Sequence, residues 1–323
     1  MPAPATSSSV SSKDAAERVD CLIIGAGPAG LTAATYLRRY HRCIALVDAG
    51  KSRARWIPES HNCPGFPLGL AGDALLKRFR QQAEAYGTEI IEGCIARLEK
   101  QGDGDDAGFL ATAEDGRRWR ACFVILATGV VDRMPAMQGL VEAIECHAVR
   151  VCAICDAYEA SDGDIAIQAP VDEGIRHALF LRTFSEKVCV LPTDEAAPSA
   201  DLASQARAAG IDILPPAVSM ALVNGRTEVI DAEGTRRVFD TLYPVLGSDA
   251  QSALALALGA GHDDNAELEV GADMQTRIDG LYAIGDVVSA LNQVAVGVGH
   301  AAVAATQVHN RLPPNPRERQ PDN

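Results

Sequence analysis

The segment that most constrains the fold of this chain is a glycine-rich turn, GAGPAG, at residues 25–30. It follows the apolar run CLIIG and precedes LTAATYLRRY, which has a helical composition; the next apolar run, CIALVD, ends at Asp48. A strand, a helix and a second strand within about 30 residues make a βαβ unit, whose strands are parallel and whose connection is right-handed. The sequence therefore predicts an α/β fold built on a parallel sheet.

The spacing of the glycines predicts a dinucleotide site at this turn. The first glycine of GxGxxG permits a tight turn, the second lets backbone approach a pyrophosphate, and the third lets helix and strand pack closely. The helix N-terminus then presents free N–H groups to the anion. An acid that holds ribose hydroxyls is expected about 20 residues later, where Asp48 stands, and this agreement disfavours an ordinary loop. The predicted contacts are Gly25, Gly27, Pro28, Ala29, Gly30, Asp48 and Ala49.

Composition limits the possible partners and the redox state. A length of 323 residues predicts two domains, and 47% apolar residues are enough to bury a sizeable core. The 29 basic and 43 acidic residues leave a net charge of −14, which disfavours nucleic acid and anionic membranes as partners. Nine cysteines are an odd number and too dilute for a disulfide scaffold, so most are expected to be reduced thiols.

The two ends of the chain predict no targeting segment. Residues 1–18 are rich in Ala, Ser and Pro and carry no apolar stretch after a basic start, so no secretory signal is expected. Residues 1–18 and 313–323 are predicted to be disordered tails. No apolar run approaches the ~20 residues that cross a bilayer. A cytoplasmic protein is the expectation.

A second α/β pattern begins at Asp164. It contains a strand IAIQ, a helix GIRHALFLRTF, a strand VCVLP, a helix over 200–209 and a final strand-like run VFDTLYPVLG. The end of the chain returns to glycine-rich turns with GLYAIGDV and a long helix over 293–310. Two α/β units, one inserted into the other, explain this order.

Two cysteines three positions apart, Cys152 and Cys155, stand shortly before the second pattern. Such a pair in a first helical turn can close a small disulfide, and the helix dipole lowers thiol pKa values. A zinc site with Cys146 and His147 is one alternative, but adjacent ligands cannot easily face one tetrahedral ion, and no second CxxC exists. Two buried cysteines without chemistry are the other alternative. The spacing favours a redox dithiol and no metal.

Several segments together carry a resemblance to a known family. The sequence contains GAGPAG, SHNCPGFP at 60–67, ATG, CxxCD, ALFLRTF, GDV and a final helix that begins with NQ, in that order. From about Val19 to Leu312 the chain resembles the low-molecular-weight thioredoxin reductases and their thiol-disulfide oxidoreductase relatives. The resemblance implies two nested Rossmann-like dinucleotide-binding domains and a homodimer. The implied FAD-binding domain is split into 19–131 and 248–312, and the inserted CxxC-bearing, NAD(P)-like domain covers 132–247.

The resemblance assigns further FAD contacts. ILATG and GLYAIGDV look like the second and third FAD motifs of flavoprotein reductases, in which the aspartate of GDV binds the ribityl chain. Asp286 takes that role, with a turn or helix-cap aspartate as the alternative. A helix that begins near Asn292 would stabilise negative charge on reduced flavin, although Asn292 could instead be only the N-cap. The predicted contacts are Asn62, Ala127, Thr128, Gly129, Gly285, Asp286, Asn292, Gln293 and Val294.

The resemblance also assigns the redox roles. In this family the second cysteine of the pair faces the flavin, the first exchanges with a disulfide substrate, and the following aspartate donates and accepts the proton. Those roles fall on Cys155, Cys152 and Asp156. The implied partner is a thioredoxin-like protein or a small dithiol or disulfide, which reacts through a mixed disulfide.

The second α/β pattern departs from the family at its NADPH loop. The place of the loop after IAIQ reads APVDEG at 169–174, which lacks the first two glycines and adds Asp172 and Glu173 where a pyrophosphate would lie. After VCVLP, the basic cluster that would bind a 2′-phosphate is replaced by Thr193-Asp194-Glu195. The helix is retained, so we expect the fold to persist without ordinary NADPH affinity.

Three functional hypotheses follow. The first is an FAD-dependent thiol-disulfide oxidoreductase that exchanges electrons with oxygen or an electron-carrier protein instead of NADPH. The second is an NADPH-dependent thioredoxin reductase with an unusual loop. The third is a flavin-bound redox sensor without turnover, which the intact CxxCD disfavours.

Several single residues have two interpretations each. His61 could steer a proton or be a structural histidine, and Cys63 could be a third reactive thiol or a packed cysteine. Arg53 and Trp56 could line the FAD site or only cover it. His300 is interpreted as a packing residue.

Overall fold

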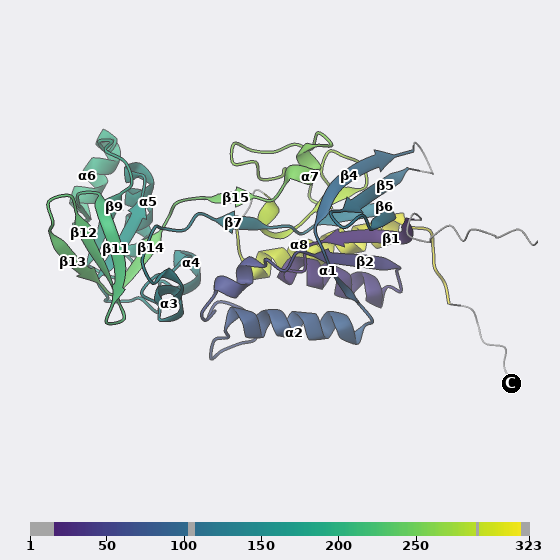
Figure 1. Ribbon diagram of the computed structural model, residues 1–323, viewed down its shortest axis with the longest axis horizontal. Helices are drawn as coiled ribbons and strands as arrows, with labels where there is room; N and C mark the ends of the chain where they lie inside the picture. Colours follow the sequence, from purple (N-terminus) through teal and green to yellow (C-terminus); the bar gives the residue numbers. More distant parts are fainter. Residues whose placement is uncertain (1–15, 103–106, 289–290, 318–323) are drawn as a thin grey trace, which may run out of the picture. The chain divides into compact units, whose positions relative to one another are not determined.

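The computed structural model describes residues 16–102, 107–288 and 291–317. The sequence also predicts a hairpin over 97–119 with QGDGDD at its tip. Most of this tip, and most of both predicted tails, lie outside these residues. The described chain forms two compact units (Figure 1). Unit 1 takes the residues up to Ser52, Lys77–Val130 and the residues from Ala250 on, whereas unit 2 takes Arg53–Leu76 and Val131–Asp249.

The unit boundaries at 130/131 and 249/250 lie next to those expected at 131/132 and 247/248. Segment 53–76 groups with unit 2, although the sequence placed it in the first domain. The assignment of these units as FAD and NAD(P)-like domains stays a prediction.

Unit 1 is built on one mixed sheet. Its strands are β1 (Glu17–Ile24), β2 (Ile44–Asp48), β3 (Ile90–Glu92), β4 (Ile95–Gln101), β5 (Gly108–Ala113), β6 (Arg118–Leu126) and β16 (Leu281–Ala283). Their order is β3-β2-β1-β6-β5-β4, and β16 also pairs with β6. β1 is parallel to β2 and to β6, whereas β4, β5 and β6 pair antiparallel. The predicted parallel βαβ unit is therefore confirmed.

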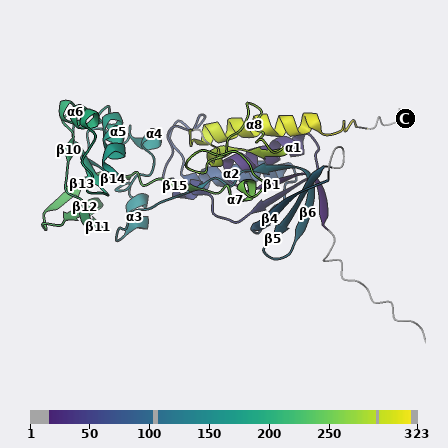
Figure 2. The ribbon, with the colours of Figure 1, turned by 90° about the horizontal axis from the view of Figure 1, so that it is seen from above.

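Small and apolar residues let the helices of unit 1 pack closely. They are α1 (Pro28–Arg39), α7 (Ala253–Leu256) and α8 (Val294–Arg311), and α2 (Gly72–Ala85) begins in unit 2 and ends in unit 1. Ala33 and Ala34 of α1 are fully buried, and α1 packs against α8, as both views show (Figures 1 and 2). Leu22 and Ile23 of β1 are also fully buried, so this strand anchors the core of the unit.

Unit 2 has two small sheets. The parallel sheet has the order β10-β9-β8-β14, with β8 (Ile165–Ala169), β9 (Val188–Pro192), β10 (Asp212–Ile213) and β14 (Thr241–Pro244). The antiparallel sheet consists of β11 (Ala217–Val223), β12 (Arg226–Asp231) and β13 (Arg236–Phe239). The helices are η1 (Arg53–Trp56), α3 (Leu140–Glu145), α4 (Ala153–Asp156), α5 (Val171–Leu181) and α6 (Ala200–Ala208). Strands β7 (Val130–Asp132) and β15 (Ser248–Ala250) pair where the chain passes between the units.

Two predicted elements of unit 2 are corrected. The single strand expected over 238–247 is two strands in different sheets, β13 and β14. Asp240 separates them, because its carboxylate accepts the Asp164 N–H at 2.9 Å and its own N–H donates to the Asp164 carbonyl at 2.9 Å. The helix α5 begins at Val171, three residues before the predicted start at Gly174. Among the described residues, no helix combines the length and apolarity needed to cross a membrane.

Candidate functional site

The glycine-rich turn of unit 1 has little room for side chains on one side and open space on the other. Gly25 has φ +104°, and a Cβ there would lie 2.4 Å from the Ala127 carbonyl oxygen. A Cβ at Gly30 would lie 1.9 Å from the Gly25 carbonyl oxygen. At Gly27, by contrast, a Cβ would meet only the Ser52 Oγ, at 3.5 Å. The first and third glycines are therefore required by packing, whereas the second leaves backbone open to a ligand.

Asp48 shapes the same turn. Its Oδ1 accepts the N–H of Ala26 at 3.0 Å, and its Oδ2 lies 3.4 Å from Arg80 Nη2. The residue is 8% exposed at the end of β2. Asp48 therefore couples β2 to the glycine turn, and its contact with a ribose stays a prediction.

The other glycine motifs of unit 1 converge on this turn. The Ala127 N–H donates to the Ile24 carbonyl at 2.8 Å, and the Thr128 Oγ1 donates to the Gln251 carbonyl at 2.6 Å. Gly129 has φ +66° and Gly285 has φ +72°. A Cβ at Gly285 would lie 3.0 Å from the Ala29 Cβ. The turns at 25–30, 127–129 and 285–287 thus lie together, as a shared ligand requires.

The start of α8 completes this group of motifs. A Cβ at Gly297 would lie 3.5 Å from the Gly285 Cα, so the first turns of α8 approach the GDV turn. Gln293 occupies the N-cap position, so the alternative in which Asn292 is the N-cap is wrong. The Asn292 Oδ1 is buried and has no hydrogen-bond partner among the described residues. Val294 is the first residue of α8. A buried acceptor without a partner fits a bound group that donates hydrogen bonds.

Asp286 lies in the 3₁₀ turn η3 (Gly285–Val287) among other titratable groups. Burial, Asp263 and Asp286 raise the pKa of Glu267. Burial lowers the pKa of His300, against an opposing effect of Asp286. These residues fit FAD. The glycine turns can accommodate a pyrophosphate, the carboxylates can accept hydroxyl groups, and the unpartnered acceptor at the start of α8 can accept a further hydrogen bond.

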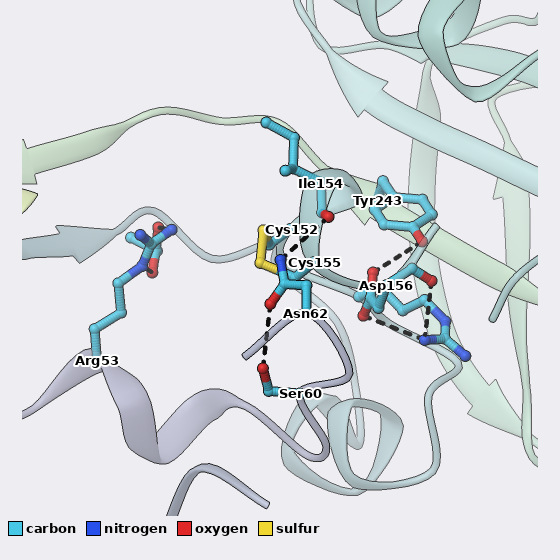
Figure 3. The surroundings of a disulfide bond; sticks show 10 residues. Arg53, Ser60, Asn62, Cys152, Ile154, Cys155, Asp156 and Tyr243 are labelled. Carbon is cyan, nitrogen blue, oxygen red and sulfur yellow. Dashed lines mark hydrogen bonds and ion pairs between the residues drawn. A yellow bond between two sulfur atoms is a disulfide. The ribbon is translucent and has the colours of Figure 1, made fainter. Parts of the chain in front are cut away.

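The cysteine pair of unit 2 forms a disulfide at the start of a short helix (Figure 3). Cys152 is the N-cap of α4, and Cys155 lies one turn later, with an S–S distance of 2.07 Å and a Cα–Cα distance of 5.3 Å. The predicted disulfide is confirmed. Among the described residues, no three His, Cys, Asp or Glu side chains gather in a way that could hold a metal ion.

Asp156 follows the pair and is held by two side chains (Figure 3). Its Oδ1 accepts the Tyr243 hydroxyl at 3.0 Å, and its Oδ2 lies 3.2 Å from Arg150 Nη1. Asp156 is 8% exposed and Tyr243 is 2% exposed. Burial raises the pKa of Asp156, and Arg150 and Tyr243 oppose that rise. A buried carboxyl of this kind can hold a proton, as a proton donor must.

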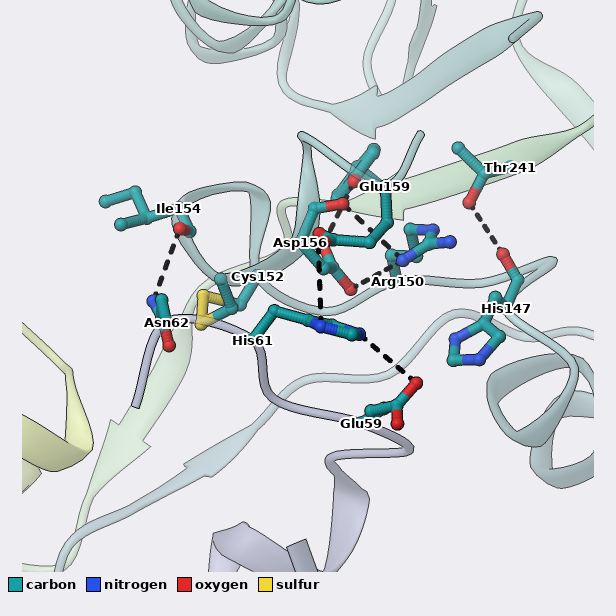
Figure 4. A network of polar contacts seen from close by, with 12 residues as sticks. Glu59, His61, Asn62, His147, Arg150, Cys152, Ile154, Asp156, Glu159 and Thr241 are labelled. Carbon is teal, nitrogen blue, oxygen red and sulfur yellow. Dashed lines mark hydrogen bonds and ion pairs between the residues drawn. A yellow bond between two sulfur atoms is a disulfide. The ribbon is translucent and has the colours of Figure 1, made fainter. Parts of the chain in front are cut away.

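The segment SHNCPGFP packs beside this helix within unit 2 (Figure 4). Asn62 Nδ2 donates to the Ile154 carbonyl at 3.4 Å, and its Oδ1 accepts the Ser60 hydroxyl at 3.3 Å. His61 Nε2 lies 3.2 Å from Glu59 Oε2, and its Nδ1 lies 3.9 Å from Glu159 Oε1. The structure therefore brings Asn62 together with the cysteine pair, and its flavin contact stays a prediction.

The second βαβ unit has a different turn after its first strand. Pro170 alone separates β8 from α5, and it is the N-cap of that helix. Val171 stands where the second glycine of the motif would be, and its side chain is 4% exposed in the core of the unit. Gly174, the third glycine position, is retained: a Cβ there would lie 2.6 Å from Val190 Cγ1. The packing glycine remains, and the loop that would surround a pyrophosphate is absent.

The acidic residues of this turn form ordinary contacts at the start of α5. Asp172 Oδ1 accepts the Ser199 N–H at 2.9 Å. Glu173 lies 3.0 Å from Arg176 and 3.2 Å from His177. These carboxylates stabilise the start of the helix, where a phosphate would otherwise be favoured.

Four other residues considered in the sequence lie in unit 2. Arg53 donates to both carboxylate oxygens of Asp132, at 2.6 and 2.8 Å, and Trp56 is 41% exposed. Burial raises the pKa of the Cys63 thiol. Cys146 is a free, exposed cysteine. The predicted FAD contacts other than Asn62 thus lie in unit 1, and the redox residues lie in unit 2.

Sequence reasoning missed the partners of Asp156 and His61. Arg150 precedes the cysteine pair by two positions, and Tyr243 comes from the distant strand β14. Glu159 follows Asp156 by three positions but lies beyond the end of α4, and its partner His61 is distant in the sequence. The partnership with Tyr243 depends on tertiary structure.

Comparisons with known proteins cover both units. The family described as pyridine nucleotide-disulphide oxidoreductase matches residues 19–307. The chain is 28% identical over 321 residues to a thioredoxin reductase of Peptoclostridium acidaminophilum, with 92% of this chain and 98% of that protein covered. HlmI superposes with a TM-score of 0.84 at 26% identity, over 90% of this chain and 92% of HlmI. The thioredoxin reductase of Streptococcus pyogenes superposes with a TM-score of 0.82 at 26% identity, over 92% and 98% of the two chains.

Proposed function

This chain belongs to the pyridine nucleotide-disulphide oxidoreductase family as a thioredoxin reductase-like, FAD-dependent disulfide oxidoreductase, and from that premise we propose that it does not use NADPH in the usual way. It passes two electrons between FAD, the Cys152–Cys155 pair and a thiol substrate. Oxygen or an electron-carrier protein takes the place of NADPH.

The turn between β8 and α5 carries this proposal. Where unit 1 has Gly25 and Gly27, unit 2 has Ala169 and the buried Val171. Asp172 and Glu173 add negative charge at the helix N-terminus, which repels a pyrophosphate. Ala169 and Val171 oppose this ligand by occupying space, and Asp172 and Glu173 oppose it by charge.

The redox residues support exchange with a thiol. FAD, when bound by the glycine turns of unit 1, supplies or accepts the electron pair. A substrate thiolate attacks the Cys152 sulfur, the Cys152–Cys155 bond breaks, and Cys155 leaves as a thiolate. The second substrate thiolate then attacks the substrate sulfur of the mixed disulfide and releases Cys152 as a thiolate. Asp156, which burial makes a better proton carrier, protonates Cys155.

The substrate class follows from the relatives. Proteins similar to this chain are named thioredoxin reductases, which supports a thioredoxin-like protein or a small dithiol as the substrate. The same names favour a second candidate, an NADPH-dependent thioredoxin reductase whose altered turn still binds the nucleotide.

An anaerobic titration of the yellow holoenzyme separates the two candidates. We expect NADPH to leave the flavin absorbance unchanged and dithiothreitol to bleach it. The variant Cys155→Ser should keep its yellow colour with dithiothreitol but bleach with dithionite, which controls for a flavin that can be reduced. Rapid bleaching by NADPH would establish the second candidate and exclude the first.

A further inference from the structure

Oxidation of a substrate dithiol by the Cys152–Cys155 disulfide moves two protons, whereas Asp156 accounts for one. Resting on the proposed function, we propose that His61 is the second acid–base group and that it serves the substrate thiol. Asp156 then serves Cys155, and His61 exchanges protons with solvent.

His61 lies on the flank of the redox helix. The neighbouring Asn62 donates to the carbonyl of Ile154, which stands between the two cysteines, at 3.4 Å. His61 Nδ1 lies 3.9 Å from Glu159, in the turn that follows α4. The Asn62 and His61 contacts therefore hold this segment against the redox helix within unit 2, with the imidazole drawn next to the disulfide (Figure 4).

The two side chains that hold Asp156 offer it no proton relay to solvent. One carboxylate oxygen accepts the hydroxyl of Tyr243, which is 2% exposed, and the other pairs with Arg150, whose side chain is 11% exposed. Burial raises the pKa of Tyr243, and a guanidinium keeps its protons at any physiological pH. Neither neighbour can pass a proton onward near pH 7.

The His61 side chain has the exposure and the chemistry that Asp156 lacks. It is 33% exposed, and imidazole is the side chain that normally exchanges protons near neutral pH. Glu59 holds Nε2 at 3.2 Å, and Glu159 lies near Nδ1. A Cβ at Gly69 would lie 2.6 Å from His61 Cε1, so the ring also packs closely on backbone. These contacts orient the imidazole.

The charged groups around the imidazole come from several elements. Glu59 lies on its own segment, and Glu159 and Asp156 come from α4 and the turn after it. Arg150 and His147 precede the cysteine pair. Burial lowers the pKa of His147, Arg150 and then His61 add to this effect, and Asp156 and Glu59 oppose it.

The proton transfers balance with the bond changes. His61 takes the proton of the first substrate thiol, and the resulting thiolate attacks Cys152 while Cys155 leaves and is protonated by Asp156. His61 releases this first proton to solvent, takes the proton of the second substrate thiol as that thiolate displaces Cys152, and passes it to the leaving Cys152 thiolate. Asp156 recovers its own proton from the Cys155 thiol when that thiol next ionises. The substrate loses two electrons and two protons, and the cysteine pair gains both.

The test measures disulfide reduction without relying on the flavin. Holoenzyme is mixed anaerobically with dithiothreitol, quenched with an alkylating reagent, and scored for alkylated Cys152 and Cys155 by mass spectrometry between about pH 5.5 and 9.5. For His61→Gln we expect a roughly 100-fold lower rate at pH 7, the size typical of a lost acid–base group. The deficit should shrink above the ordinary thiol pKa of about 8.5, where dithiothreitol ionises unaided.

A matched control comes from the same unit. The His177 side chain is 34% exposed and lies 3.2 Å from Glu173, almost the same values as for His61 and Glu59. His177→Gln should follow the wild-type rate and pH profile. Glu159→Gln leaves the imidazole in place, so it should retain the fast reduction at pH 7 that His61→Gln loses.

The outcomes separate this inference from the proposed function. A His61→Gln rate equal to wild type, or a deficit of constant size across the pH range, would overturn the role of His61. In that case bleaching by dithiothreitol and resistance to NADPH would still support the proposed function. Conversely, NADPH bleaching with a pH-dependent His61→Gln deficit would overturn the NADPH proposal alone.

Discussion

The two βαβ units of this chain share a topology and differ in the turn that a dinucleotide would occupy. In unit 1, residues 25–27 form an open turn before α1, and in unit 2 only Pro170 separates β8 from α5. The packing glycine is common to both, as Gly30 and Gly174. Helix and strand therefore pack closely in both units, but only the first keeps a loop.

A second difference concerns the bond that holds the turn. In unit 1, Asp48 accepts the N–H of Ala26. Aligned on the strand pairing, the corresponding residues of unit 2 are Pro192 and Pro170, which offer no carboxylate and no N–H. Both partners of the bond are missing. The close packing of such a unit therefore depends on one glycine, whereas the ligand loop depends on several residues that can be lost together.

The largest expected effect comes from exchanging the packing glycines for alanine. Gly30→Ala places a Cβ 1.9 Å from backbone, so we expect loss of FAD and little folded protein. Gly174→Ala meets side chains alone, with a Val190 methyl group at 2.6 Å and the Ala169 Cβ at 3.4 Å, so it should keep FAD and lose about 1–3 kcal/mol of stability. For each variant, the flavin-to-protein ratio measures FAD retention and urea unfolding measures stability. If Gly30→Ala bound one FAD per chain, the glycine-rich turn at 25–30 would not be part of the FAD site.

A smaller effect is expected at the second glycine position of unit 2. Val171→Gly restores the motif residue but removes a side chain that is 4% exposed, so we expect a loss of about 2–4 kcal/mol. It should not restore reduction by NADPH, because Asp172 and Glu173 remain. Val171→Ala is the control that separates lost packing from glycine flexibility. Flavin bleaching by NADPH in the glycine variant would show that space alone excluded the nucleotide.

The smallest expected effect is on the pH dependence of stability. It is tested at two histidines with left-handed backbone, one in each unit. His147 has φ 65° and His41 has φ 57°. Burial and Arg150 lower the pKa of His147, so the fold favours its neutral form and loses stability as pH falls below about 6.5. His147→Asn, which tolerates this backbone, should reduce that acid loss by less than about 1 kcal/mol, since the site is partly solvated.

Thermal unfolding between pH 7 and 5 measures this difference. His41→Asn is the control, and its curve should parallel that of the wild type because His41 is exposed. An unchanged pH dependence in His147→Asn would show that another group carries the acid sensitivity of unit 2.

The sequence predicted the elements that local patterns define. The strand, glycine turn and helix at 21–40 were readable because apolar runs and glycine spacing are local signals, and the Cys152–Cys155 disulfide followed from spacing within one helical turn. The start of α5 was misplaced because Pro170 as an N-cap extends the helix to Val171. The split of 238–247 into two strands depends on the long-range bonds between Asp240 and Asp164.

By itself, then, the sequence determined that this chain is an α/β protein with one complete and one altered dinucleotide turn and a redox-active cysteine pair. Only the tertiary structure decided which side chains serve that pair: Tyr243 reaches Asp156 from β14, and His61 reaches Glu159 from a segment far earlier in the chain. The physical reason is distance along the chain. Local patterns record backbone preferences, whereas the partners of a buried carboxyl are selected by the packing of strands and turns that no short spacing encodes.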